Sequence, residues 1–243
     1  MEEHKLVIVE FVNGFLRWVL GIFGVEGLEG KEILPSHIVM AFLITVIIIL
    51  FFKLAVKKEK LSVREPGKMQ NFLEMIYKFF QGLVDDVIGH EGRKFIPLLA
   101  TMGLFIVVSN LLGLLPEMGS PTANLNTTAG CAIFVISYYH YQGIKKHGIR
   151  GYIKTFTGTI WWLAPLMLPI ELISHLSRPL SLSLRLFGNI FGEDLVIIII
   201  AGLLPIIAPL PVMALAVITS LLQAYIFVML TTIYLAGAMA EEH

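Results

Sequence analysis

SRPLSLSLRLFGNIFGEDLV, residues 177–196, is a polar stretch between long apolar runs. Its arginine, Arg185, cannot lose its proton in a protein and therefore keeps its charge in any surroundings. An arginine at the centre of a membrane-spanning helix costs at least about 2.5 to 3.5 kcal/mol on insertion scales. We therefore expect Arg185 to have a charged partner, and the sequence has to be searched for it.

The composition is that of a membrane protein. Of the 243 residues, 56% are apolar and 15% are charged, against about 45 to 50% and 25% in soluble domains. The 18 basic and 18 acidic side chains cancel, so no net attraction to nucleic acid is expected. The acidic N-terminus, MEEHK, lacks the basic start of a secretory signal. A single cysteine, Cys131, excludes an intrachain disulfide.

Apolar segments long enough to cross a bilayer recur along the chain. They predict an all-α membrane protein with a single membrane domain, residues 1–243, and about five membrane-crossing helices. The predicted membrane segments are 35–56, 95–115, 129–144, 155–204 and 206–240. The segment 155–204 is much longer than the roughly 20 residues that a perpendicular span needs. We expect it to be tilted, bent or partly re-entrant, with kinks at its prolines.

Residues 66–90 predict a different kind of helix. Their apolar residues repeat on one helical face, and charged residues occupy the rest. With a charge at nearly every turn, this segment is expected to lie in the headgroup plane as one interfacial amphipathic helix. A cytoplasmic helix that packs on protein is the alternative.

Basic residues indicate how the chain is oriented. Lys and Arg follow the first predicted span between Lys53 and Arg64, and they recur in KKHGIRGYIK after residue 144. The loop PEMGSPTANLNTT has neither. Since cytoplasmic loops carry an excess of Lys and Arg, the N-terminus is predicted outside and the C-terminus in the cytoplasm. The apparently unprocessed N-terminus favours a bacterial inner membrane.

Polar side chains share one face of the predicted helix 155–204. At 100° per residue, they lie within about 40° of a common line. This face holds Glu171, Ser174, Arg178, Ser181, Arg185 and Asn189. Glu171 lies about 21 Å from Arg185 along the helix, whereas Asp194 lies about 13 Å beyond Arg185 on the opposite face, with Glu193 between the two faces.

None of these acids can form an i,i+4 salt bridge with Arg185, so a carboxylate from elsewhere is implied. A proton route needs acids on both membrane sides, and a permanent cation between them would prevent protons from leaking straight through. The acids around Arg185 have this arrangement. In the alternative interpretation, Arg185 snorkels to an interface or pairs with a buried carboxylate for packing alone.

The stretch SRPLSLSLRLFGNIFGEDLV, together with QAYIFVMLTTIYL near the C-terminus and PTANLNTT in the outward loop, resembles subunit a of the rotary F-type ATP synthase. The resemblance covers nearly the whole chain. It implies a non-catalytic membrane stator, because the ATP chemistry of that complex is on other subunits. It also implies that the two C-terminal helices form a long tilted hairpin facing a c-ring, whose subunits each carry one ion-binding carboxylate, and that peripheral-stalk subunit b is a further partner.

The resemblance assigns roles to particular residues. Arg185 would face the passing ring carboxylate, favour its ionised form and separate two offset half-channels. Glu171 would lie near the cytoplasmic mouth, and either Glu193 or Asp194 would be the outward relay. The other expected pathway residues are Ser181, Asn189, Gln223, Asn124 and Asn126. The transported ion would be a proton or Na⁺.

Other functions receive less support from the sequence. An autonomous secondary transporter is the alternative function, but such proteins usually contain paired repeats, and none is visible. A structural scaffold would not need a central arginine with acids on either side. No HExxH, CxxC or phosphate-loop motif occurs, so neither a metal nor a cofactor is expected. Gly188 and Gly192 form a GxxxG pair that predicts close helix packing, either within the chain or against a ring helix.

Overall fold

The computed structural model describes residues 9–14, 17, 33–58, 67–115, 118–157, 164–204 and 207–239, and the regular secondary structure within these ranges is helical. The predicted all-α class is therefore confirmed. Part of the basic segment between Lys53 and Arg64 lies outside the described residues, as does residue 66 of the predicted helix 66–90. Residues 158–163 of the predicted segment 155–204 and residues 206 and 240 of the predicted segment 206–240 also lie outside them.

The first half of the described chain holds a long apolar helix, an amphipathic helix and a second apolar helix. α2 (Ser36–Lys58) corresponds to the predicted span 35–56, and α3 (Lys68–Val87) to the predicted interfacial helix 66–90. A turn at Gly89 leads into the short 3₁₀ helix η1 (His90–Phe95) and then α4 (Ile96–Gly113). Gly89 has φ of 82°, a conformation that glycine adopts without the steric cost of a Cβ atom.

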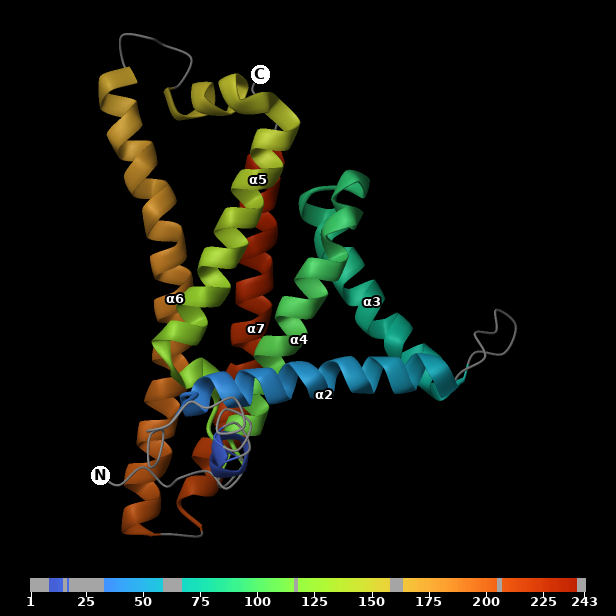
Figure 1. Ribbon diagram of the computed structural model, residues 1–243, viewed down its shortest axis with the longest axis vertical. Helices are drawn as coiled ribbons and strands as arrows, with labels where there is room; N and C mark the ends of the chain where they lie inside the picture. Colours follow the sequence, from blue (N-terminus) through green and yellow to red (C-terminus); the bar gives the residue numbers. More distant parts are fainter. Residues whose placement is uncertain are drawn as a thin grey trace.

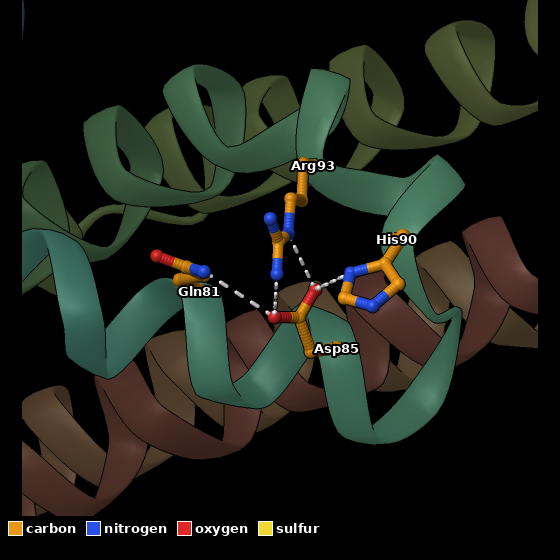
Figure 2. Close-up of polar contacts among 4 residues, drawn as sticks. All are labelled: Gln81, Asp85, His90 and Arg93. Carbon is orange, nitrogen blue, oxygen red and sulfur yellow. Dashed lines mark hydrogen bonds and ion pairs between the residues drawn. The ribbon is translucent and has the colours of Figure 1, made fainter.

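A cluster of polar side chains fixes the turn between α3 and α4 (Figure 2). The carboxylate of Asp85 accepts hydrogen bonds from Nε of Arg93 at 2.9 Å and from Nη2 at 2.7 Å. Gln81 donates to the same carboxylate at 3.4 Å, and Nδ1 of His90 lies 3.7 Å from it. The hydrogen bonds from Arg93 hold the pKa of Asp85 below its ordinary value. The cluster therefore links the end of the amphipathic helix to the start of α4.

The second half consists of three long helices. A short 3₁₀ helix, η2 (Pro121–Ala123), precedes α5 (Leu125–Thr157), which contains a break at Gly148 with φ of 71°. α6 (Ala164–Leu203) and α7 (Pro209–Met239) follow. Prolines lie in the first turn of both α6 and α7, where the missing N–H has no intrahelical partner to lose.

The predicted boundaries of the last three helices need correction. Segment 129–144 is only the middle of α5, because this helix starts at Leu125 and continues past the expected basic loop. The prediction that one helix begins at 155 is wrong, since residues 155–157 end α5 and α6 begins at Ala164. α6 remains one helix of 40 residues although Pro169 and Pro179 lie inside it. The last helix starts at Pro209, three residues later than predicted.

Four helical segments in the described ranges are long and apolar enough to cross a membrane: Ser36–Val56, His90–Gly113, Pro165–Leu203 and Pro209–Met239. The chain is therefore a multi-pass membrane protein. α5 is not among them, because Tyr, His and Lys residues interrupt its apolar run. The fifth crossing at 129–144 stays a prediction, which gains support from the course of α5 alongside α6 and α7 (Figure 1).

Two groups of buried residues hold the helices together. One joins α3, α4, α5 and α7 around Phe80, Phe95 and Tyr139, and the other joins α4, α5, α6 and α7 around Ile106, Leu186 and Phe227. The end of α7 and the break in α5 lie at one end of this bundle, and the end of α6 lies at the other (Figure 1). α2 runs across the direction of α5, α6 and α7 in this view, so its role as a span rests on its hydropathy.

Candidate functional site

Arg185 lies near the middle of α6 and its side chain is exposed. α6 packs against its neighbours through Leu182, Leu186 and Ile190, which recur every four residues and are at most 3% exposed. This packing turns Arg185 away from the core. No hydrogen bond or ion pair connects its guanidinium to any residue that the structure describes.

The surface beside Arg185 has room for another helix. A Cβ atom added at Gly188 or at Gly192 would meet nothing within 4 Å. The GxxxG pair is therefore not packed against the described residues. Little of the apolar part of α6 is buried within the chain, about 11%. Large apolar side chains such as Leu180 and Phe191 are exposed on this helix. We call the surface formed by Leu180, Arg185, Gly188, Phe191 and Gly192 the open face of α6.

One turn after Arg185, Asn189 links α6 to α7. Its amide nitrogen donates to Oε1 of Gln223 at 2.8 Å. Gln223 is 2% exposed, and its own amide nitrogen has no hydrogen-bond partner among the described residues. The structure therefore brings together two of the predicted pathway residues, Asn189 and Gln223, close to the arginine.

Of the two acids after Arg185, Glu193 contacts α7. The hydroxyl of Thr219 donates to Oε1 of Glu193. Asp194 is half-buried, and no hydrogen bond joins it to a described residue. The two acids are thus held differently, but each stands on the side of Arg185 nearer to the end of α6.

Further buried polar groups lie where α4 meets η2, at the end of the bundle where α6 ends. The hydroxyl of Thr122 donates to Oδ1 of Asn110 at 2.6 Å and lies 2.6 Å from the hydroxyl of Ser120. The amide nitrogen of Asn110 and the hydroxyls of Ser109 and Ser220 have no partner among the described residues. Buried polar groups of this kind are normally satisfied by water when protein supplies no partner.

The two asparagines predicted in the outward loop have different positions. Oδ1 of Asn124 accepts the backbone N–H of Asn126 at 2.9 Å, the bond of a residue that caps a helix N-terminus. Asn124 therefore caps α5, while the side chain of Asn126 is exposed. Ser181, one turn before Arg185, is exposed on α6.

Glu171 belongs to a second polar cluster, at the other end of α6. Its Oε1 lies 3.1 Å from Nε2 of His175, one turn later on the same helix. Nδ1 of His175 lies 2.6 Å from the hydroxyl of Tyr139 on α5. Arg178 places its guanidinium over the ring of Tyr234 on α7, with 5.3 Å between Cζ and the ring centre. Side chains from three helices thus meet around Glu171.

Comparison with known proteins shows the family of this chain. A family model described as "ATP synthase A chain" matches residues 38–236. The chain belongs to the ATP synthase A chain family. Its similar proteins in this family include "ATP synthase subunit a 1" and "ATP synthase subunit a 3" of Pelobacter propionicus, which are 45% and 50% identical to it over 240 residues. "ATP synthase subunit a" of Geobacter sulfurreducens is 44% identical, and in all three comparisons 99% of each chain is covered.

In this member of the ATP synthase A chain family, the predicted polar face of α6 separates into two parts. Arg178 lies over Tyr234 of α7, and Glu171 contacts His175, which reaches Tyr139 of α5. In contrast, Arg185 and Ser181 are exposed. Asn189 is exposed but reaches Gln223. A common position on one helical face therefore did not reveal which of these side chains share a site.

Sequence reasoning did not assign pathway roles to several polar residues of the site. The i,i+4 spacing of Glu171 and His175 was a usable signal. Tyr139 and Asn110 had no such signal, because only the packing of α5 on α6 and of α4 on η2 brings them to their partners. Among the described residues, no group of three or more His, Cys, Asp or Glu side chains is arranged to hold a metal ion.

Proposed function

We propose that this chain is the ion-translocating stator subunit of the membrane sector of an F-type ATP synthase. It would carry no catalytic site of its own, and ATP chemistry would take place on other subunits. The family membership supports the place in the complex. The observation that carries the mechanism is an exposed arginine, without a partner in the described chain, in the middle of a 40-residue membrane helix.

The open face of α6 is where a c-ring would pass. An unpaired guanidinium in lipid is costly, and a carboxylate on a ring subunit would satisfy it. Each ring carboxylate that reaches Arg185 would be stabilised in its ionised form by the opposite charge. Gly188 and Gly192 would allow a ring helix to approach closely, since a Cβ atom at either position would meet no described residue within 4 Å.

An outward half-channel would run through the polar groups beyond Arg185. Asp194 or Glu193 would be the relay, and Asn189, Gln223 and Asn126 would line the path together with Asn124. The buried polar atoms of Asn110 and Ser220 that lack protein partners support a hydrated route here. The capping bond of Asn124 gives that residue a structural role as well.

An inward half-channel would open near Glu171, about 21 Å along α6 from Arg185, with Ser181 between the two. The two routes would be offset, so an ion has to travel on the ring to pass from one to the other. Arg185 would prevent a direct leak because a fixed positive charge repels a cation between the half-channels. Rotation of the ring would then couple ion flow, of protons or Na⁺, to ATP synthesis.

The proposal includes the setting of the subunit. The chain would lie in a bacterial inner membrane with its N-terminus outside and its C-terminus in the cytoplasm, as the basic segments indicate. Its protein partners would be the c-ring subunits and peripheral-stalk subunit b.

Replacement of Arg185 by alanine tests the mechanism. Without the fixed charge, ATP synthesis driven by an ion gradient should fall at least about tenfold, because a charge-assisted partner of the ring carboxylate is lost. Passive ion leak through the membrane sector should rise while assembly is retained. Arg93→Ala is the matched control, since Arg93 binds Asp85 outside the site. Wild-type synthesis in Arg185→Ala, or failed assembly without any leak, would contradict the proposal.

A further inference from the structure

We infer that Tyr139 and His175 form, with Glu171, a hydrogen-bonded triad that positions the carboxylate of Glu171 and lets it take part in proton uptake without moving. The inference rests on the proposed function and concerns the inward half-channel. Tyr139 and His175 would be positioning residues, because they act through Glu171.

The triad runs from the surface of the bundle to its core. The side chain of Glu171 is 39% exposed, that of His175 is 15% exposed, and Tyr139 is fully buried. Two contacts join them: 3.1 Å from Oε1 of Glu171 to Nε2 of His175, and 2.6 Å from Nδ1 of His175 to the hydroxyl of Tyr139. The carboxylate is therefore exposed on one side of the bundle and linked to a buried phenol on the other.

The direction of each hydrogen bond follows from the chemistry of the groups. An ionised carboxylate only accepts, so Nε2 of His175 must carry a proton and donate to Glu171. In the neutral imidazole, Nδ1 then has no proton and accepts one hydrogen bond from the hydroxyl of Tyr139. All three groups are satisfied in this state.

The same heavy-atom arrangement also suits one extra proton. An extra proton that water delivers to Nδ1 converts His175 to an imidazolium, which donates from both nitrogens. This proton does not pass through Nε2, because Nε2 already carries the proton that it donates to Glu171. Glu171 continues to accept from Nε2, and the hydroxyl of Tyr139 rotates from donor to acceptor. Both hydrogen bonds still join the same heavy atoms, and none of these atoms has to move. The proton leaves Nδ1 by the reverse change. Tyrosine suits this place because a hydroxyl both donates and accepts.

Other titratable groups surround the triad and take part in its electrostatics. Arg178 lies three residues after His175 on α6, with its guanidinium over the ring of Tyr234. His140 and Tyr152 face it from α5, with the rings of His140 and His175 5.1 Å apart. Tyr234 faces it from α7, with 6.2 Å between its ring centre and that of Tyr139. A pH profile of the inward route therefore reports on the triad within this cluster.

ATP-driven proton pumping in inverted membrane vesicles tests the inference on the assembled enzyme. In such vesicles the cytoplasmic mouth faces the bath, so the bath pH acts on the triad. Pumping is measured against bath pH and divided by the ATP hydrolysis rate of the same membranes. Tyr139→Phe removes one oxygen atom and keeps the ring. Tyr138→Phe, on the neighbouring half-buried tyrosine, is the matched control.

Tyr139→Phe should move the half-maximal point of the profile to lower pH by about one unit. Without the hydroxyl, the charged Nδ1–H of the His175 imidazolium has no acceptor, and this costs more than the loss of a donor to the neutral Nδ1. The variant therefore disfavours the protonated form of His175. His175→Gln should remove this titration, and Tyr139→Phe added to His175→Gln should cause no further shift. Tyr138→Phe should leave the profile unchanged. The amount of chain that copurifies with the ring controls for assembly.

The outcomes separate this inference from the proposed function. If Arg185→Ala abolishes pumping but Tyr139→Phe and His175→Gln both keep the wild-type profile, the triad is overturned and the stator proposal stands. A shift in Tyr139→Phe that persists at full size in the His175→Gln background also overturns the triad. If Arg185→Ala pumps like the wild type, the proposed function itself fails.

Discussion

The hydrogen bond between Asn189 and Gln223 gives a prediction that separates packing from ion transport. Three variants are required: Asn189→Leu, Gln223→Leu and the double variant. The bond is 2.8 Å long and joins α6 to α7 one turn after Arg185. Its two ends differ in burial, since Asn189 is exposed and Gln223 is 2% exposed.

This difference in burial predicts an asymmetry. Asn189→Leu leaves the amide of Gln223 buried without any partner among the described residues, which should destabilise the chain by about 0.6 to 1.7 kcal/mol, the range for side-chain hydrogen bonds in membranes. Gln223→Leu removes both buried polar atoms and should be close to neutral. The double variant should resemble Gln223→Leu, so the two substitutions should not be additive.

Cys131 provides the assay, because it is the single cysteine of the chain and it packs against the core group that α6 and α7 share. The purified membrane sector is treated with a thiol-reactive dye, and labelling is read on the separated chain. Labelling that requires local opening should be about three to eighteen times faster in Asn189→Leu than in wild type, from the same range of free energies. Asn126→Leu, at an exposed position, is the control.

Two results would refute this reasoning. Equal destabilisation by the two single variants would show that burial of Gln223 does not set the cost. Additive effects in the double variant would show that the two amides do not interact. If the double variant is stable but pumps no ions, the amides serve the pathway; if it is stable and pumps normally, they are only packing and their proposed pathway role fails.

Two further predictions concern the open face of α6 and the turn at Asp85. Gly188→Leu should leave the chain as stable as wild type but block ion pumping, because the leucine side chain enters space that only a ring helix would fill. Gly103→Leu is the contrasting variant. It should lower stability, since a Cβ atom at this position would lie 2.9 Å from Phe80. Pumping and Cys131 labelling measure the two effects, and wild-type pumping in Gly188→Leu would contradict a ring at this face. Asp85, whose pKa is lowered by Arg93, should stabilise the turn fully at neutral pH and lose this effect as the pH falls through its lowered pKa. Hydrogen exchange of residues 88–95 should therefore accelerate in acid in wild type, after correction for intrinsic rates, and in Asp85→Asn it should be fast already at neutral pH.

Much of the fold could be read from hydropathy, because a bilayer imposes one requirement on every span: a long apolar helix. Residues 35–56, 66–90 and 95–115 correspond to helices within a few residues. The failures occurred where local signals conflict. Residues 155–157 were predicted to begin a helix but end α5, and the break at Gly148, where φ is positive, was not predicted.

The site shows the same division. Hydropathy and charge spacing alone identified Arg185 as the unusual residue, because the cost of a permanent charge in lipid does not depend on the details of packing. Whether Arg185 points into the bundle or out of it depends on which face of α6 is buried, and Leu182, Leu186 and Ile190 decide that only by packing against other helices. The pairing of Glu171 with His175 and Tyr139, and of Asn189 with Gln223, likewise required the tertiary structure. Sequence therefore determined which charges and helices the membrane has to accommodate, and tertiary structure decided which side chains meet, because residues distant along the chain come within hydrogen-bonding range only when helices pack.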